Sequence, residues 1–297
     1  MKPHKLALLG GVLLLVVVAG ACSWVSALKA RDHLNKGVAA FRNAQFQQAI
    51  MHFKTAVDLD PTLLNARLYL ATAYAQQYIP GGDSPDNIKI GKQAVEAFED
   101  VLKMKPDETT AIASIAQIYY NMKDFDKAKE YQRRRLQVDP NNPEPYYWIG
   151  VIDWATVYPR RMQVRKDLNL TMPKDPSKPD ELPPIPEKAR AQLEADNTAL
   201  VEEGIQALQK AVDMKPSDAD AMAYLNLIYR ERADFQKAPD AREADLKLAE
   251  QWVEKALDIK FPSTRTWSSK SVKAGNWRVD ITDEAGAVLA SVSFTVK

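Results

Sequence analysis

Val101-Leu-Lys-Met-Lys-Pro106 and Leu136-Gln-Val-Asp-Pro140 each read as the last turn of a helix that a proline closes. The two prolines stand 34 residues apart, and Pro61 closes Ala56-Val-Asp-Leu-Asp-Pro61 in the same way. Self-similarity at a fixed period of this length is typical of arrays in which each unit is one pair of antiparallel helices. The sequence therefore predicts an all-α solenoid of about five helical hairpins.

The hairpins can be placed by their apolar periodicity. Small residues such as Gly37, Ala49 and Ala128 recur where two helices must approach closely, and large apolar residues recur at the gaps between helices. We expect an array over residues 30–262, with hairpins at residues 30–63, 64–106, 109–142, 143–215 and 219–259.

These features resemble the tetratricopeptide repeat family, in which small residues mark the helix contacts and a proline ends the second helix. The third unit has the family's standard length and carries Ile115, Ala116, Tyr119, Phe125 and Ala128 at the family positions. The resemblance implies a superhelical scaffold without enzymatic activity. Such a scaffold usually binds a peptide of a protein partner on its inner, concave face.

By register, the concave face carries aromatic and amide side chains. Aromatic residues supply much of the binding energy at protein interfaces, and such a groove suits an extended or helical peptide. Ordinary packing against the next helix is the alternative for Tyr120 and Trp154. The lysine–asparagine clamp that some relatives use for a C-terminal carboxylate is missing, because Leu34 and Val38 stand at its key positions. The expected partner-binding residues are Gln76, Gln117, Tyr120, Asn121, Tyr147, Trp154 and Arg230.

Two insertions interrupt the repeats. The first, at about residues 77–90, contains Pro80-Gly-Gly-Asp-Ser-Pro85 and is predicted to be a loop. The second, at about residues 158–199, holds six prolines between Pro173 and Pro186, a density that favours extended backbone. A short helix over residues 187–196 is expected to lead back into the array. A loop of this length is either functional or a tolerated surface insertion, and both interpretations stay open.

Basic residues gather in the third unit and again at the start of the second insertion. One hypothesis is that they grip an anionic ligand or an acidic partner, which with Asp153 would make the chain a ligand-binding protein or an enzyme. The preferred interpretation is internal pairing, because Asp153 falls at an interior position and a buried carboxylate needs a partner. Arg160 and Arg161 are the candidate partners of Asp153. The basic residues concerned are Arg133, Arg134, Arg160, Arg161 and Arg165.

The sequence contains no recognisable catalytic or cofactor motif. It lacks a phosphate-binding loop, a nucleophile elbow, an EF-hand loop and a cysteine–histidine cluster with zinc spacing. We therefore expect no enzyme, no cofactor and no metal site, and interpret His33 and His52 as separate surface residues. The net charge of +1 argues against nucleic acid as a partner.

Residues 1–22 resemble a bacterial lipoprotein signal. Lys2 and Lys5 precede an apolar run that ends in small residues and Cys22, the one cysteine of the chain. The resemblance implies lipid attachment at Cys22 and a body in the cell envelope that faces the periplasm, with the outer membrane preferred in a diderm cell. An uncleaved single-pass transmembrane anchor over residues 6–24 and a cleaved secretory signal are the alternatives. All three place the body outside the cytoplasm.

Residues 263–297 change to a period of two. Trp277, Val279 and Ile281 alternate with polar residues, and the alternation resumes from Val288 to Val296 after a turn, which predicts a β-hairpin. Residues 265–296 resemble the closing part of a small bacterial domain of unknown function, whose preceding half is missing here. Such a hairpin could cap the array, or it could drive self-association and make the chain a structural spacer.

Overall fold

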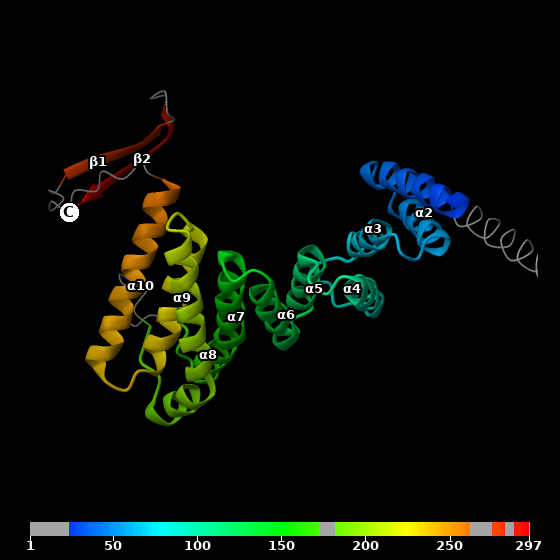
Figure 1. Ribbon diagram of the computed structural model, residues 1–297. Coiled ribbons are helices and arrows are strands. Elements are labelled where there is room, and N and C mark those ends of the chain that lie inside the picture. Colours follow the sequence, from blue (N-terminus) through cyan, green and yellow to red (C-terminus); the bar gives the residue numbers. More distant parts are fainter. Residues whose placement is uncertain (1–23, 173–181, 262–274, 283–287, 297) are drawn as a thin grey trace, which may run out of the picture. The chain divides into compact units, whose positions relative to one another are not determined.

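The computed structural model of the chain describes residues 24–172, 182–261, 275–282 and 288–296. Cys22 and the predicted signal lie outside these ranges. Contacts divide the chain into two compact units between Ala256 and Leu257. A helix over residues 24–42 is followed by α2 (Phe46–Leu59), α3 (Leu64–Ala75), α4 (Pro85–Met104), α5 (Thr109–Asn121), α6 (Phe125–Val138), α7 (Pro143–Asp167), α8 (Glu187–Met214), α9 (Ala219–Phe235) and α10 (Pro239–Lys260), then β1 (Gly275–Thr282) and β2 (Val288–Val296) (Figure 1).

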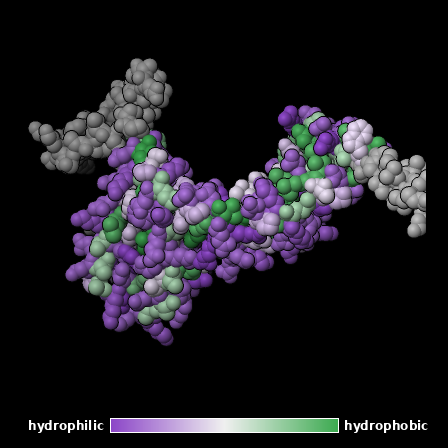
Figure 2. Space-filling view, in the orientation of Figure 1, coloured by the Kyte–Doolittle hydropathy of each residue, from purple (hydrophilic) through white to green (hydrophobic). Residues whose placement is uncertain are grey.

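Each helix from α2 to α8 packs on the next helix in sequence order, and α7 also contacts α9 (Figure 1). The array is therefore a helical solenoid, as predicted, rather than a single closed core. Its apolar residues form successive clusters along the chain: one around Phe53, one around Phe98 and Ile112, and one around Leu208 and Leu225. Hydrophilic residues cover most of the face of the array drawn in Figure 2.

The prolines end the second helices of the hairpins through the residue that precedes each of them. Asp60, Lys105 and Asp139 close α2, α4 and α6 with φ of −141°, −135° and −138°. Lys215 closes α8 with φ of −136° before Pro216. A proline ring disfavours the helical conformation of the preceding residue, so each of these helices ends at the residue before its proline. This local steric effect produces the period seen in the sequence.

Small residues are required at the helix contacts. A Cβ atom added to Gly150 would lie 2.3 Å from Cγ of Leu208, and one added to Gly37 would lie 2.4 Å from Cε1 of Phe53. Real side chains do not approach so closely, so α7 can pack on α8 only because residue 150 has no side chain. The predicted role of glycine at these positions is confirmed.

We expect the Gly150→Leu variant to lose about 1–3 kcal/mol of unfolding free energy, because its side chain overpacks the contact between α7 and α8. Chemical denaturation followed by circular dichroism measures the loss. A double variant supplies the matched test. In Gly150→Ala combined with Leu208→Ala, the new methyl group at residue 150 should partly fill the cavity left by the truncated Leu208 side chain. The two substitutions should therefore cost less together than the sum of their separate effects. Strictly additive costs would argue against this contact.

The fourth hairpin is longer than predicted, and the predicted break at Tyr158 is wrong. The helix α7 continues through Pro159 to Asp167, and the helix expected at residues 187–196 is one with the helix that follows, as α8. A proline inside a helix costs a hydrogen bond, which tertiary contacts can outweigh. Val157, Leu193 and Val201 bury their side chains in the core cluster of this region. Much of the insertion is therefore a longer helical hairpin.

Asn87 holds the first insertion in place. Its side-chain oxygen accepts a hydrogen bond from the backbone N–H of Ile79 at 2.8 Å, and its amide nitrogen donates to the carbonyls of Ile79 and Gly82 at 2.8 and 2.9 Å. The loop is shorter than predicted, because α4 already begins at Pro85 with Ser84 as its N-cap.

In the second unit, β1 and β2 form an antiparallel two-stranded sheet. Trp277 pairs with Phe294 and Val279 with Val292, and the register shifts between Ile281 and Thr282. The two strands of the predicted hairpin are thus present over residues 275–282 and 288–296, and its predicted turn lies outside the described residues. The register places the two apolar sets of alternating residues opposite one another along the strands.

Candidate functional site

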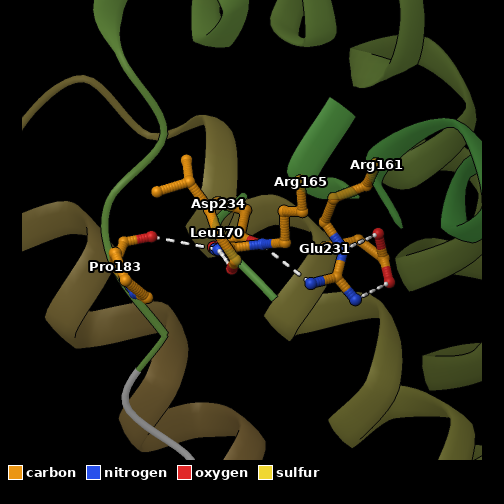
Figure 3. Close-up of polar contacts among 6 residues, drawn as sticks. All are labelled: Arg161, Arg165, Leu170, Pro183, Glu231 and Asp234. Atoms are coloured by element: carbon orange, nitrogen blue, oxygen red, sulfur yellow. Dashed lines mark hydrogen bonds and ion pairs between the residues drawn. The ribbon is translucent and has the colours of Figure 1, made fainter. Parts of the chain in front are cut away.

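The basic residues of the second insertion form a buried ionic cluster, which we call the arginine network: Arg161, Arg165, Glu231 and Asp234. Arg161 donates to both carboxylate oxygens of Glu231 at 2.6 and 2.9 Å and to Asp234 at 2.8 Å. Arg165 donates to both oxygens of Asp234 at 2.9 and 2.6 Å (Figure 3). Planar two-point contacts of this kind are the strongest that arginine makes with a carboxylate. Two arginines of α7 are therefore neutralised by two acids of α9.

Arg165 also fastens the second insertion. Its Nη1 donates to the carbonyl of Leu170 at 3.1 Å, before the proline-rich stretch, and to the carbonyl of Pro183 at 3.0 Å, within it (Figure 3). The Arg165 side chain is only 1% exposed. A buried charge requires such complete pairing, because an unpaired one would be costly to desolvate. Arg165 is thus a structural clamp rather than a contact for an external anion.

Asp153 is paired inside the protein, but with a different residue from those predicted. Its Oδ1 accepts a hydrogen bond from Lys129, whose Nζ also lies 3.1 Å from Glu203. Arg160 reaches Asn197 instead, at 3.3 Å, and Arg161 belongs to the arginine network. Lys129 lies on α6, and Asp153 lies on the next helix, α7. The long aliphatic stem of Lys129 lets its ammonium group reach the interior carboxylate of Asp153, and the ammonium group is also paired with Glu203. The prediction of internal pairing holds, and the prediction of its partner was wrong.

Burial governs the acid–base behaviour of Asp153. The residue is 0% exposed, and its Oδ2 lacks a hydrogen-bond partner among the described residues. Burial raises the pKa of the Asp153 carboxyl to about 7, although the hydrogen bond from Lys129 acts in the opposite direction. Desolvation penalises the charged form of a carboxyl, so the neutral form persists in the folded protein at unusually high pH.

The two basic groups do not converge on one ligand site. Arg133 pairs with Glu203, and Arg134 donates to the carbonyl of Pro106 at 2.7 Å. Together with the pairing of Arg160, Arg161 and Arg165, these contacts give each of the five arginines a partner within the protein. The hypothesis of an anion held between Arg133, Arg134 and the second group is therefore not supported by their geometry.

Aromatic side chains from α5, α7 and α9 form a continuous series of ring contacts, which we call the aromatic cluster. Neighbouring centroids lie 5.1 Å apart for Tyr120–Trp148 and 5.4 Å apart for Tyr147–Trp148. Tyr224 joins Tyr147 at 5.8 Å and Trp154 at 5.4 Å. Most of these pairs meet edge to face, a favoured arrangement for aromatic rings. In order along the series, the members are Tyr120, Trp148, Tyr147, Tyr224, Trp154 and Tyr158.

The aromatic cluster is only half-buried and has an unsatisfied donor. Tyr120, Tyr147 and Tyr224 keep part of their surface exposed, and burial of the rest raises the pKa of each phenol. The indole N–H of Trp154 is buried and has no hydrogen-bond partner among the described residues. Unpaired buried donors are uncommon in folded proteins. The cluster can therefore offer its partly exposed tyrosine rings to an incoming peptide.

Comparison with known families identifies the helical array. Residues 91–149, which cover most of α4, all of α5 and α6 and the start of α7, match the family model "Tetratricopeptide repeat". Residues 91–149 carry tetratricopeptide-repeat sequence. The match includes the third hairpin, for which the sequence predicted the family's standard length, and it includes Tyr120, Tyr147 and Trp148 of the aromatic cluster.

Curated proteins with tetratricopeptide repeats match only parts of the chain. "Interferon-induced protein with tetratricopeptide repeats 2" of Cricetulus griseus is 38% identical over 58 residues, which are 20% of this chain and 12% of that protein. "Hsp70-Hsp90 organizing protein 3" of Arabidopsis thaliana is 25% identical over 115 residues, which are 39% of this chain and 19% of that protein. The chain thus spans less than a fifth of the length of each of these relatives.

Solved structures of repeat proteins share the fold over most of the chain. "Crystal structure of MamA protein" superposes with a TM-score of 0.52 at 13% identity and covers 81% of this chain and 97% of that chain. "MamA 41-end from Desulfovibrio magneticus RS-1" superposes with a TM-score of 0.51 at 17% identity and covers 80% and 98%. These likenesses show the fold of the repeats alone.

The C-terminal part matches a second family. Residues 246–296 match "Protein of unknown function (DUF2914)". The match begins inside α10, so it is longer than the predicted resemblance over residues 265–296. The match overlaps α10, the helix that the sequence assigned to the last repeat. The helical period of Ala249 and Ala256 had hidden this overlap.

The remaining predicted partner-binding residues lie on the first helices of the repeats, but they do not join the aromatic cluster. Gln76 is exposed at the end of α3. The amide of Gln117 donates to Asn121 at 3.2 Å, and Arg230 donates to Asn226 at 3.0 Å. Sequence reasoning also missed Trp148, Tyr158 and Tyr224 as members of the cluster. Trp148 follows Tyr147 directly, and this pair of adjacent aromatics could have indicated it.

His33 and His52 were predicted to be separate surface residues, but the structure brings their rings into contact. Their Nδ1 atoms lie 3.2 Å apart, across the contact between the helix of residues 24–42 and α2. Among the described residues no group of three or more histidine, cysteine or acidic side chains could hold a metal ion. Nor does that part of the chain contain a helix with the length and apolarity needed to cross a membrane.

Proposed function

We propose that the chain is a lipid-anchored scaffold of the cell envelope, whose tetratricopeptide repeats bind a protein partner through the aromatic cluster. The single observation that carries this proposal is the series of ring contacts that joins α5, α7 and α9. Interfaces concentrate their binding energy in tyrosine and tryptophan, and half-buried rings lose little conformational entropy on binding. The arrangement suits a peptide that crosses three successive repeats in extended or helical form.

Two further points support a binding role. The ionisable groups with the most interior positions, Asp153 and the arginine network, are paired within the protein rather than aimed at a substrate. The partial match to a protein named for organizing Hsp70 and Hsp90 is consistent with an array that holds other proteins. The partner of this chain is a protein of its own compartment, and we propose no enzyme activity.

The proposed location depends on the N-terminal sequence. Acylation of Cys22 after signal cleavage would tether the repeats to the membrane, facing the periplasm, with the outer membrane preferred in a diderm cell. Mass spectrometry of the mature protein from native membranes tests this: a diacylglyceryl-modified Cys22 at the new N-terminus is the expected result. An intact N-terminus that begins at Met1 would instead favour the single-pass anchor.

We expect the double variant Tyr120→Ala with Trp154→Ala to lose its partner while it stays folded. Each substitution removes ring contacts from the cluster, and hot-spot truncations of this kind cost about 2 kcal/mol or more of binding free energy. Crosslinking in native membranes, followed by co-purification and mass spectrometry, measures the loss. Circular dichroism checks that the helices remain.

Tyr119→Ala is the matched control. Tyr119 precedes Tyr120 on α5, but it packs against Tyr131 of α6 and not against the aromatic cluster. This variant should keep every partner that the wild type crosslinks. If the double variant also keeps them all, the binding surface lies elsewhere on the repeats.

A second candidate function follows from the sheet. The pair β1–β2 has two strands, each with one unpaired edge within the described part of the unit, and a two-stranded sheet is marginally stable by itself. Self-association through this unit would make the chain a structural spacer. Light scattering on the chain with and without residues 263–297 distinguishes this candidate, because only the full chain should form dimers or larger species.

A further inference from the structure

A cavity of about 460 Å³ lies at the start of α8, the end of α9 and the start of α10, where the second insertion returns to the array. Arg190, Lys237 and Arg242 border it, together with the carboxylates of Glu187 and Asp234. The cavity shares no residue with the aromatic cluster. Its volume falls in the range of small-molecule sites.

The charges around this cavity do not balance. Asp234 is already engaged by Arg161 and Arg165 through the arginine network. Setting that network aside, three cationic groups and one carboxylate, Glu187, remain, which leaves an excess of two positive charges. Nη1 of Arg190 is buried, and no described residue accepts a hydrogen bond from it. A buried guanidinium donor without an acceptor is costly unless a ligand supplies one.

The surroundings add to the positive potential. A second cavity of about 200 Å³ shares Asp234 and Arg242 with the first and is also bordered by Arg230. The first turns of α8 and α10 both line the larger cavity, and the N-terminal end of a helix carries a partial positive charge. Arg242 therefore stands where the two recesses meet, with cations on both sides.

Part of the wall is apolar. Pro184, Ile185 and Pro239 line the larger cavity, and Ile185 is almost fully buried. A ligand that fits this wall has an uncharged apolar portion as well as its anionic group. Pockets of this composition bind organic molecules through a few fixed polar groups and an apolar surface.

We propose that this cavity binds a small organic phosphate, with the phosphate held by Arg190 and Arg242 and the organic portion against Pro184, Ile185 and Pro239. A phosphate monoester carries about −1.5 to −2 charge at neutral pH, which matches the excess of two positive charges, whereas a carboxylate would leave one uncompensated. Arginine forks suit the geometry of phosphate oxygens. The site is independent of the protein-binding function proposed for the aromatic cluster.

Isothermal titration calorimetry with phenyl phosphate on the full chain tests the proposal. The wild type should bind it saturably at pH 8, more tightly than inorganic phosphate or benzoate. Arg242→Gln and Arg190→Gln should each weaken binding by about tenfold or more. The exposed Lys237 gives a third variant, Lys237→Gln, that leaves the buried wall intact and should weaken binding less. Affinity should fall as the pH drops below about 6, where the monoester takes up its second proton.

Lys210→Gln is the matched control, because it removes one exposed positive charge from α8 without altering the cavity. It should bind phenyl phosphate as the wild type does. A lipid headgroup is the other source of a phosphate, and vesicles with and without phosphatidic acid separate the two. Vesicle binding that phenyl phosphate competes and Arg242→Gln abolishes assigns the site to a headgroup. Absence of saturable binding to either probe, or equal binding by wild type and Arg242→Gln, would overturn the proposal.

Discussion

The Asp234→Ala variant is expected to lose about 3–5 kcal/mol of unfolding free energy, because it leaves a buried guanidinium without its carboxylate. Arg165 is 1% exposed and directs two of its three nitrogens at Asp234. Arg161 would keep its two contacts with Glu231, so the loss falls mainly on Arg165. Urea denaturation at pH 7 measures the effect, with the prediction that α7, α8 and α9 unfold together.

Two further variants separate the charge from the packing. Arg165→Met combined with Asp234→Leu removes both charges and should recover most of the lost stability, since apolar pairs of similar volume often replace buried ion pairs without cost. Asp213→Ala removes an exposed carboxylate of α8 and should change stability by less than about 0.5 kcal/mol. A cost below about 1 kcal/mol for Asp234→Ala would show that water screens the network.

The second large effect concerns pH. The wild type should become less stable relative to Asp153→Asn by about 1.4 kcal/mol for each pH unit between pH 5 and pH 7. The pKa of Asp153 is raised from its ordinary value of 3.8 to about 7 by burial. In that window the folded protein therefore holds a proton that the unfolded chain has released, and unfolding becomes easier as the pH rises. The stability is fully present below the ordinary pKa and is lost as the pH approaches 7.

The comparison between the two proteins isolates this carboxyl. Every other ionisable group is common to both proteins, so its contribution cancels in the difference. The nearby charges of Lys129, Glu203 and Arg133 are the same in both proteins, and asparagine still accepts the hydrogen bond from Lys129 through its side-chain oxygen. Denaturation curves at pH 5, 6 and 7 supply the measurement. A difference that stays constant with pH would place the pKa of Asp153 outside the window.

Much of the candidate site could be predicted one residue at a time, but its assembly could not. Tyr120, Tyr147 and Trp154 follow from the helical register, because positions on one face of a helix repeat regularly along the chain. Their connection through Trp148 and Tyr224 depends on how α5, α7 and α9 pack together, which no local pattern encodes. The same holds for Asp153: its interior position follows from the period, whereas its partner Lys129 stands 24 residues earlier on another helix.

The sequence by itself determined the helical repeats, because their signals act within a few residues. Each proline forces the residue before it out of the helix, and each glycine at a contact lets two helices approach. Only the tertiary structure decided the length of the fourth hairpin and the roles of its arginines. The helix through Pro159 and the clamp of Arg165 on Leu170, Pro183 and Asp234 gain their free energy from groups far apart in sequence. Such contacts exist only once the helices have packed, so the order of residues along the chain does not reveal them.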